Sequence, residues 1–317
     1  MITRRLLLPT LLLGPSLAST ALAQAPAPAA AGAMPVVTTF SILADLVRSV
    51  GAERAAVTSL VGPDSDAHAY APSPADAKTI AAAKLVFVNG LGFEGWISRL
   101  IRSSGTRAKV ITASTGIAPL KAEDDHGHGH GHGGGHGHSH GENDPHAWQN
   151  ALFVKRYVAN IRDALVAADP AGAELFTRNA AAYSASLDAL DAEIKAETAR
   201  IPAERRRILT THDAFQYFEK AYGIEFVALR GVASDAEPSA RELGQIIRQI
   251  KQGRITALFM ENITDPRAMQ RISAETGARL GGRLYSDALS GADGPAATYL
   301  AMMRHNIRQI SGALAQS

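Results

Sequence analysis

Short runs of β-branched and aromatic residues alternate with amphipathic segments along the first half of this 317-residue sequence. The short runs predict strands, and the segments between them show the apolar spacing of helices. Strands that alternate with helices in this way are typical of parallel sheets with helical crossovers. We therefore expect an α/β lobe with strands at Val36–Phe40, Ala56–Val61, Leu85–Asn89 and Lys109–Ala113, and helices at Ile42–Val50, Pro74–Ala83, Phe93–Ser103 and Leu152–Ala167.

A single long helical pattern, Pro170–Arg200, separates this lobe from a second one. At 1.5 Å per residue the helix would span about 45 Å, which is too long for an ordinary crossover and indicates a strut between lobes. Thr38-Thr39-Phe40 and the elements after it are echoed by Thr210-Thr211-His212, so we expect lobes of like topology. The second lobe should contain strands at Arg207–Thr211, Glu225–Leu229, Ile255–Glu261 and Leu280–Tyr285, and helices at Phe215–Tyr222, Ala240–Lys251, Pro266–Glu275 and Ala297–Ala313.

The N-terminus has the pattern of an export signal. A basic start is followed by a short apolar run and by Ala21-Leu22-Ala23, which favours cleavage near Ala23/Gln24 and a periplasmic protein. Two arginines fit either the general or the twin-arginine route. The sequence contains no cysteine, so we expect neither a lipid anchor on an N-terminal cysteine nor disulfides. The predicted organisation is a signal at 1–23, a disordered lead-in at 24–34, a lobe at 35–168, a linker helix at 169–201 and a lobe at 202–317.

The overall charge excludes some classes of partner. Removal of the signal, with Arg4 and Arg5, leaves 30 basic residues against 30 acidic ones. No basic stripe with interleaved aromatic residues is present, so we expect no nucleic-acid partner.

Eight of the eleven histidines lie between Asp124 and Trp148. Imidazoles that alternate with glycine cannot bury enough apolar area to fold, so residues 124–142 should form a solvated loop. Neutral imidazole binds zinc, copper or nickel, and a tract of this kind offers many weak, overlapping sites. A purification tag is the alternative, but tags lie at termini. The candidate auxiliary ligands are His126, His128, His130, His132, His136, His138 and His140.

Four further candidate ligands follow predicted strands or the histidine loop. They are His68, His146, His212 and Asp287. Because ligands of open α/β sheets bind at the carboxyl ends of the strands, these residues can converge on one cleft between the lobes. Three imidazoles and a carboxylate suit tetrahedral zinc, and we expect affinity to fall below roughly pH 6.5 as imidazoles become protonated. His305 is predicted to be a surface residue, and Trp148 and Tyr70 to be packing walls around the site.

Two enzyme motifs are weak or absent. Gly90–Gly95 fits G-x-G-x-x-G, but it follows the third strand and lacks a carboxylate where a ribose would bind, so we interpret it as a tight strand-to-helix turn. No H-E-x-x-H pair occurs, and four protein ligands would leave no position for an activated water. We expect a protein that is not an enzyme, although a three-histidine site with water would reopen the question of a zinc hydrolase.

Five motifs in order resemble the zinc/manganese solute-binding proteins of bacterial ABC importers. They are GPDSDAHAY at 62–70, KLVFVNGLGFE at 84–94, DPHAW at 144–148, HDAFQYF at 212–218 and LYSDAL at 284–289. The resemblance implies two Rossmann-like lobes, each with a four-stranded parallel sheet, joined by one rigid helix, with metal held by His68, His146, His212 and Asp287. Manganese-specific members resemble this sequence except for a carboxylate at the position of His212. Zinc-specific members often have a carboxylate close to the first histidine, so Asp66 is the alternative to Asp287.

The leading hypothesis is therefore a periplasmic receptor that captures Zn²⁺ and delivers it to the membrane permease of an ABC importer. A periplasmic zinc buffer or chaperone is one alternative, and a manganese-specific receptor of the same fold is another. We expect a monomer, with a periplasmic zinc metallochaperone as a further candidate partner.

Overall fold

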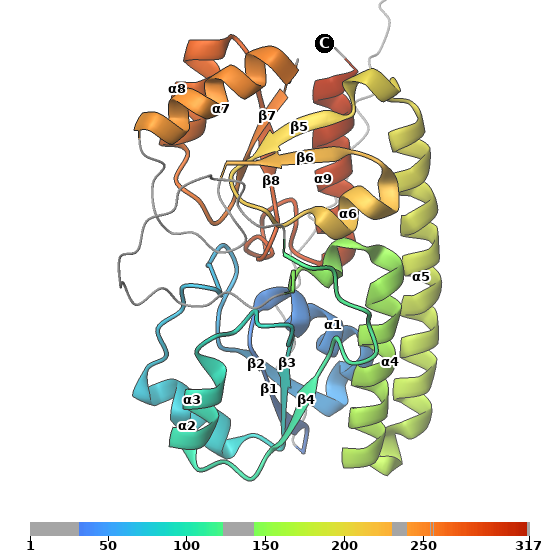
Figure 1. Ribbon diagram of the computed structural model, residues 1–317. Helices are drawn as coiled ribbons and strands as arrows, with labels where there is room; N and C mark the ends of the chain where they lie inside the picture. The colour runs from blue at the N-terminus through green and yellow to red at the C-terminus, as the bar shows by residue number, and fades with distance from the viewer. Residues whose placement is uncertain (1–31, 123–142, 230–239, 254, 256, 316–317) are drawn as a thin grey trace, which may run out of the picture.

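A computed structural model describes residues 32–122, 143–229, 240–253, 255 and 257–315 of the chain. These residues form two α/β lobes, one above the other in Figure 1, with a long helix along one side. The expected fold of two four-stranded parallel sheets joined by a long helix is confirmed. The predicted signal, most of the lead-in and the histidine-rich segment lie outside the described residues.

The N-terminal lobe contains a sheet with strand order β2-β1-β3-β4, and all of its pairings are parallel. The central strand β3 (Leu85–Val88) is apolar throughout and fully buried, as expected of a parallel strand covered on both faces. The other elements are β1 (Met34–Thr38), α1 (Ser41–Gly51), β2 (Ala55–Ser59), α2 (Pro74–Ala82), α3 (Ile97–Ser104), β4 (Lys109–Thr112) and α4 (Ala151–Ala168).

The C-terminal lobe repeats this topology. Its sheet has the order β6-β5-β7-β8 and is also parallel, which confirms the predicted likeness between the lobes. The elements are β5 (Arg207–Thr210), α6 (Gln216–Tyr222), β6 (Glu225–Ala228), α7 (Ala240–Gly253), β7 (Ala257–Glu261), α8 (Arg267–Thr276), β8 (Arg279–Leu284) and α9 (Tyr299–Leu314).

Helix α5 (Ala173–Ala199) connects the lobes and packs on both. It contacts α1 and α4 of the N-terminal lobe and α6 and α9 of the C-terminal lobe (Figure 1). Its buried positions recur at helical spacing, at Phe176, Ala180, Leu187, Leu190 and Ile194, so one apolar face spans both lobes. One continuous cluster of buried apolar side chains includes residues from α5 and from both lobes. In the described part of the chain, no helix combines the length and the apolar character that crossing a membrane requires.

The segment after β3 departs from the prediction, because α3 begins at Ile97 and not at Phe93. Gly90 and Gly92 both have φ of +86°, a region that glycine adopts without steric cost, and they form a tight turn after the strand. The buried carboxylate of Glu94 accepts hydrogen bonds from the backbone N–H groups of Asn89 and Gly90. These bonds hold the turn against the sheet, so the helix begins only after the turn, at Ile97. The interpretation of Gly90–Gly95 as a strand-to-helix turn is therefore confirmed.

Candidate metal centre

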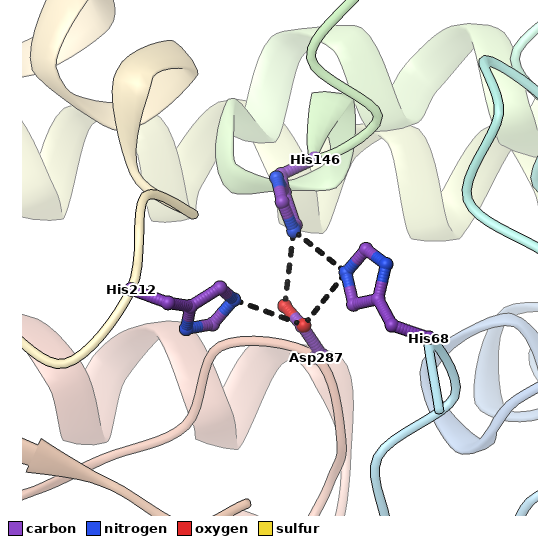
Figure 2. Close-up of side chains that lie close together, drawn as sticks. All are labelled: His68, His146, His212 and Asp287. Carbon is purple, nitrogen blue, oxygen red and sulfur yellow. Dashed lines mark hydrogen bonds and ion pairs between the residues drawn. The ribbon is translucent and has the colours of Figure 1, made fainter. Parts of the chain in front are cut away.

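Four side chains from both lobes converge at the carboxyl ends of the strands (Figure 2). His68 follows β2, His146 precedes α4, His212 follows β5 and Asp287 follows β8. One ligand atom from each residue lies within 4.8 Å of the other three. His68 Nε2 is 3.2 Å from His146 Nε2 and 3.2 Å from Asp287 Oδ2, and His212 Nε2 is also 3.2 Å from Asp287 Oδ2.

His146 is completely buried and is fixed by the carboxylate two residues before it. Asp144 Oδ1 accepts a hydrogen bond from the backbone N–H of His146 at 2.8 Å and lies 2.7 Å from its Nδ1. In the neutral imidazole, a carboxylate on Nδ1 keeps the proton on that nitrogen and leaves Nε2 with a free lone pair. Figure 2 shows this Nε2 directed at His68 and Asp287, to which dashed lines join it.

The segment that carries His146 is bonded to both lobes. Asn89 donates its side-chain N–H to the carbonyl of Pro145 at 3.0 Å, within the N-terminal lobe. Trp148 Nε1 and Gln149 Nε2 each donate to the carbonyl of Ser286 at 2.8 Å, next to Asp287. These buried hydrogen bonds thus fix the position of His146 relative to Asp287 across the boundary between the lobes.

His212 is held by a second buried carboxylate, Glu261 at the end of β7. Glu261 Oε1 accepts hydrogen bonds from the backbone N–H groups of Thr211 and His212, both at 3.0 Å, and from the Thr211 hydroxyl at 2.5 Å. Its other oxygen, Oε2, lies 2.6 Å from His212 Nδ1. As at His146, the contact with Nδ1 leaves Nε2 facing the centre.

His68 is the most accessible of the four, with 10% of its side chain exposed. Its ring packs edge-on against Phe93, with ring centroids 4.5 Å apart. Asp66 Oδ1 accepts a hydrogen bond from the backbone N–H of His68 at 2.7 Å. Among the described residues, Asp287 and not Asp66 belongs to the cluster.

The charges in the cluster favour a cation at its centre. Burial lowers the pKa of both deeper histidines, but Asp287 and Asp144 outweigh this effect and raise the pKa of His146 to about 9. Burial likewise opposes the charge of His212, but Glu261 and Asp287 raise its pKa well above the ordinary value. Burial raises the pKa of Asp287, yet His146 and His212 hold it well below the usual range. With neutral imidazoles the buried carboxylates would lack a counter-charge, so the site attracts positive ions.

Aromatic rings line the N-terminal side of the site. Trp148 is fully buried and packs edge-on against His146, with ring centroids 5.2 Å apart, and Phe40 and Phe93 pack against Trp148. The expectation that Trp148 is a packing wall is confirmed. Tyr70 instead packs on Trp96 and donates its hydroxyl to Asp76 at 2.9 Å, one layer further from the cluster.

Sequence reasoning found the four converging residues but missed the carboxylates that orient them. Asp144 had a readable signal, because Asp66-Ala67-His68 and Asp144-Pro145-His146 share the pattern Asp-x-His, and in both the carboxylate accepts from the histidine N–H. Glu261 has no local signal, since its partner His212 is distant in sequence. His305 lies outside the cluster and is half-buried, with Nε2 2.9 Å from the Arg283 carbonyl. The seven histidines predicted as auxiliary ligands fall outside the described residues.

A two-lobed α/β fold with a cluster of three histidines and a carboxylate between the lobes is the arrangement of a protein that could hold a metal ion between two domains. Residues 36–313 match the family described as "Zinc-uptake complex component A periplasmic". The chain belongs to this family of metal-binding solute-binding proteins of ABC importers. Its members are substrate-binding transport proteins, so the expectation that the chain is not an enzyme is confirmed.

Relatives and solved structures agree with this assignment. The iron-binding protein YfeA of Yersinia pestis is 34% identical over 282 residues, which cover 89% of this chain and 86% of that protein. The manganese-binding lipoprotein MntA of Halalkalibacterium halodurans is 33% identical over 89% of this chain and 88% of its own length. The periplasmic zinc binding protein TroA from Treponema pallidum is 30% identical, with a TM-score of 0.80 over 89% of this chain and 99% of that one.

Proposed function

We propose that this protein is a periplasmic receptor that captures Zn²⁺ between its lobes, with His68, His146, His212 and Asp287 as ligands, and delivers it to the permease of an ABC importer. The observation that carries the proposal is the convergence of three Nε2 atoms and a carboxylate at one buried point. The histidine-rich segment is a second, weaker group of metal ligands.

The spacing of the ligand atoms supports a tetrahedral ion. Bonds of about 2.0–2.1 Å in a tetrahedron place neighbouring ligand atoms about 3.3–3.4 Å apart. Four of the six pairs of residues have ligand atoms 3.2 to 3.5 Å apart, and all four ligand atoms lie within 4.8 Å of one another. A zinc ion can therefore bind with small adjustments of the side chains.

The donor set favours zinc over manganese. Manganese prefers oxygen ligands, whereas imidazole suits zinc and, by raw affinity, copper. The relatives are named for iron or manganese as well as zinc, so metal choice needs a direct test. We expect competition titrations of the mature protein to rank zinc above manganese and iron(II) by at least about tenfold, in line with the order for nitrogen-rich sites. A protein that prefers manganese would be the manganese receptor instead.

Metal affinity should depend on pH more steeply than free imidazole suggests. A proton bound to His146 or His212 must leave before the ion binds. The pKa of His146 is raised to about 9, so its proton is held below that pH and lost above it, and the pKa of His212 is also raised well above the ordinary value. Affinity should therefore rise from pH 6 toward pH 9 and then level off, so the decline begins at higher pH than the roughly 6.5 expected for an isolated imidazole. Competition titrations against a chelator of known proton affinity will measure this, and constant affinity between pH 6 and pH 8 would contradict it.

Deleting residues 124–141 separates a receptor from a zinc buffer. A receptor should keep one tight site, because the four proposed ligands lie outside the deletion and the chain ends at Leu120 and Asp144 are joined by a hydrogen bond of 2.9 Å. A buffer should lose most of its zinc capacity. Calorimetry of both forms gives the stoichiometry and affinity, and loss of the tight site on deletion would favour the buffer.

Two statements about partners follow from the receptor role. The relatives are named as substrate-binding proteins of ABC transporters, which supports a membrane permease as the recipient of the ion. We infer that the protein acts as a monomer, with a periplasmic zinc metallochaperone as a candidate donor.

A further inference from the structure

The turn that leads to His68 is bonded to the opposite lobe through Asp64. The backbone N–H of Asp64 donates to the carbonyl of Leu289 at 2.9 Å. Its Oδ1 accepts a hydrogen bond from the side-chain amide of Asn262 at 3.0 Å, and its Oδ2 accepts one from the N–H of Gly291 at 3.2 Å. All three partners follow β7 or β8 in the C-terminal lobe. We refer to these three hydrogen bonds as the Asp64 clasp.

The backbone of Asp64 adopts a conformation that fits this role. Its φ is +51°, in the left-handed region that side chains with a Cβ seldom occupy, although aspartate tolerates it better than most. Such a conformation persists where surrounding contacts define it strongly. Here those contacts come from the other lobe, so the shape of the turn depends on the lobes being together.

The clasp and the metal ligands form a closed ring of contacts. His68 lies four residues after Asp64, and its Nε2 is 3.2 Å from Asp287 Oδ2. Leu289, two residues after Asp287, accepts the hydrogen bond from the N–H of Asp64 and so closes the ring. On its other side His68 is held to its own lobe, because Trp96 Nε1 donates to the carbonyl of Ala67 at 2.8 Å. The position of His68 between the lobes is thus set by Trp96 on one side and by the clasp on the other.

We propose that Asp64 is a positioning residue that keeps His68 in the coordination sphere and so slows release of the ion. This inference rests on the proposed function. His68 is the most exposed of the four proposed ligands, at 10% of its side chain against 6% for His212 and 0% for Asp287, so it is the ligand that detaches first. With the clasp in place, the backbone that carries His68 stays against the C-terminal lobe, so the imidazole can detach only by rotation of its own side chain and remains close enough to rebind.

The test compares rates of zinc dissociation and association in the mature protein by stopped flow with a chromophoric chelator. Asp64→Ala removes both carboxylate contacts and should speed dissociation by about tenfold or more, the factor expected for loss of an outer-shell partner, while association changes less than about twofold. Asp64→Asn retains an oxygen for Asn262, and asparagine tolerates the left-handed conformation. Its rate of zinc dissociation should therefore lie between those of the wild type and Asp64→Ala. Adding Asn262→Ala to Asp64→Ala should speed dissociation less than Asn262→Ala does in the wild type, because the contact of Asn262 with Asp64 is already lost and only its donation to the Ala288 carbonyl remains to be removed.

Ser65→Ala is the matched control. Ser65 lies in the same turn, but its hydroxyl donates to Pro63 of its own lobe at 3.1 Å, so dissociation should stay within about twofold of wild type. Dissociation at the wild-type rate in Asp64→Ala, or an equal acceleration in Ser65→Ala, would overturn the inference. Slower association together with a loss of thermal stability in the metal-free protein would also overturn it, by showing a general structural role. A wild-type protein that holds no zinc would overturn the proposed function itself, and this inference with it.

Discussion

Replacing His212 by alanine should lower zinc affinity by more than about 100-fold, because the change removes a proposed ligand. Loss of a residue that only hydrogen-bonds a ligand typically costs about 10–100-fold. The two remaining imidazoles and Asp287 would bind the ion with an incomplete sphere. Glu261 would also lose the contact of its Oε2 with His212 Nδ1, which leaves a buried carboxylate less well paired. Calorimetric or chelator-competition titration of the mature protein measures the loss.

His305→Ala provides the control for this experiment. His305 is also a histidine of the C-terminal lobe, but it contacts the Arg283 carbonyl and the Tyr285 ring and not the cluster. Zinc affinity and stoichiometry should therefore remain those of the wild type. An unchanged tight site in His212→Ala would show that the ion binds elsewhere.

The second large effect is expected from Glu261→Gln, a change that keeps the size of the side chain. Three donors from Thr211 and His212 converge on Glu261 Oε1, so the amide oxygen of glutamine should occupy that place. Its NH₂ group then faces His212 Nδ1 and donates to it, which moves the imidazole proton to Nε2. Since Nε2 is the atom that faces the centre, we expect affinity to fall by about 10–100-fold with no ligand removed.

Glu94→Gln is the matched control for Glu261→Gln. Glu94 occupies a corresponding place in the N-terminal lobe, where its carboxylate accepts hydrogen bonds from the Thr39 hydroxyl and from the N–H groups of Asn89 and Gly90. Phe40 follows Thr39, whereas His212 follows Thr211, so Glu94 contacts no proposed ligand and reaches His146 only through Asn89 and the carbonyl of Pro145. The two variants should lose comparable thermal stability, but affinity should fall much further in Glu261→Gln, because only Glu261 contacts a proposed ligand. Equal affinity in both would show that the tautomer of His212 is unimportant.

The repeated fold could be predicted from sequence because its signals are local. Apolar strands such as Leu85–Val88 and the helical spacing along Ala173–Ala199 each lie within one element, and the order of elements then restricts the topology. The start of α3 was predicted four residues early, at Phe93 instead of Ile97. The turn there depends on Glu94 bonding back to Asn89 and Gly90, and helical periodicity does not reveal such contacts.

The site was predictable in part. The carboxyl ends of the strands form one edge of each sheet, so histidines and an aspartate that follow strands are expected to meet. The choice between Asp66 and Asp287 depends on side-chain direction: Asp66 bonds the His68 backbone, while Asp287 faces the three imidazoles. Glu261 and the Asp64 clasp join residues about 50 and 200 positions apart, and no sequence pattern links such partners.

The most direct test is a crystal structure of the zinc-loaded mature protein, with anomalous diffraction collected on both sides of the zinc edge. One strong peak should lie about 2.0–2.2 Å from Nε2 of His68, His146 and His212 and from a carboxylate oxygen of Asp287. A zinc peak bound by other residues, with these four side chains free of metal, would contradict the account.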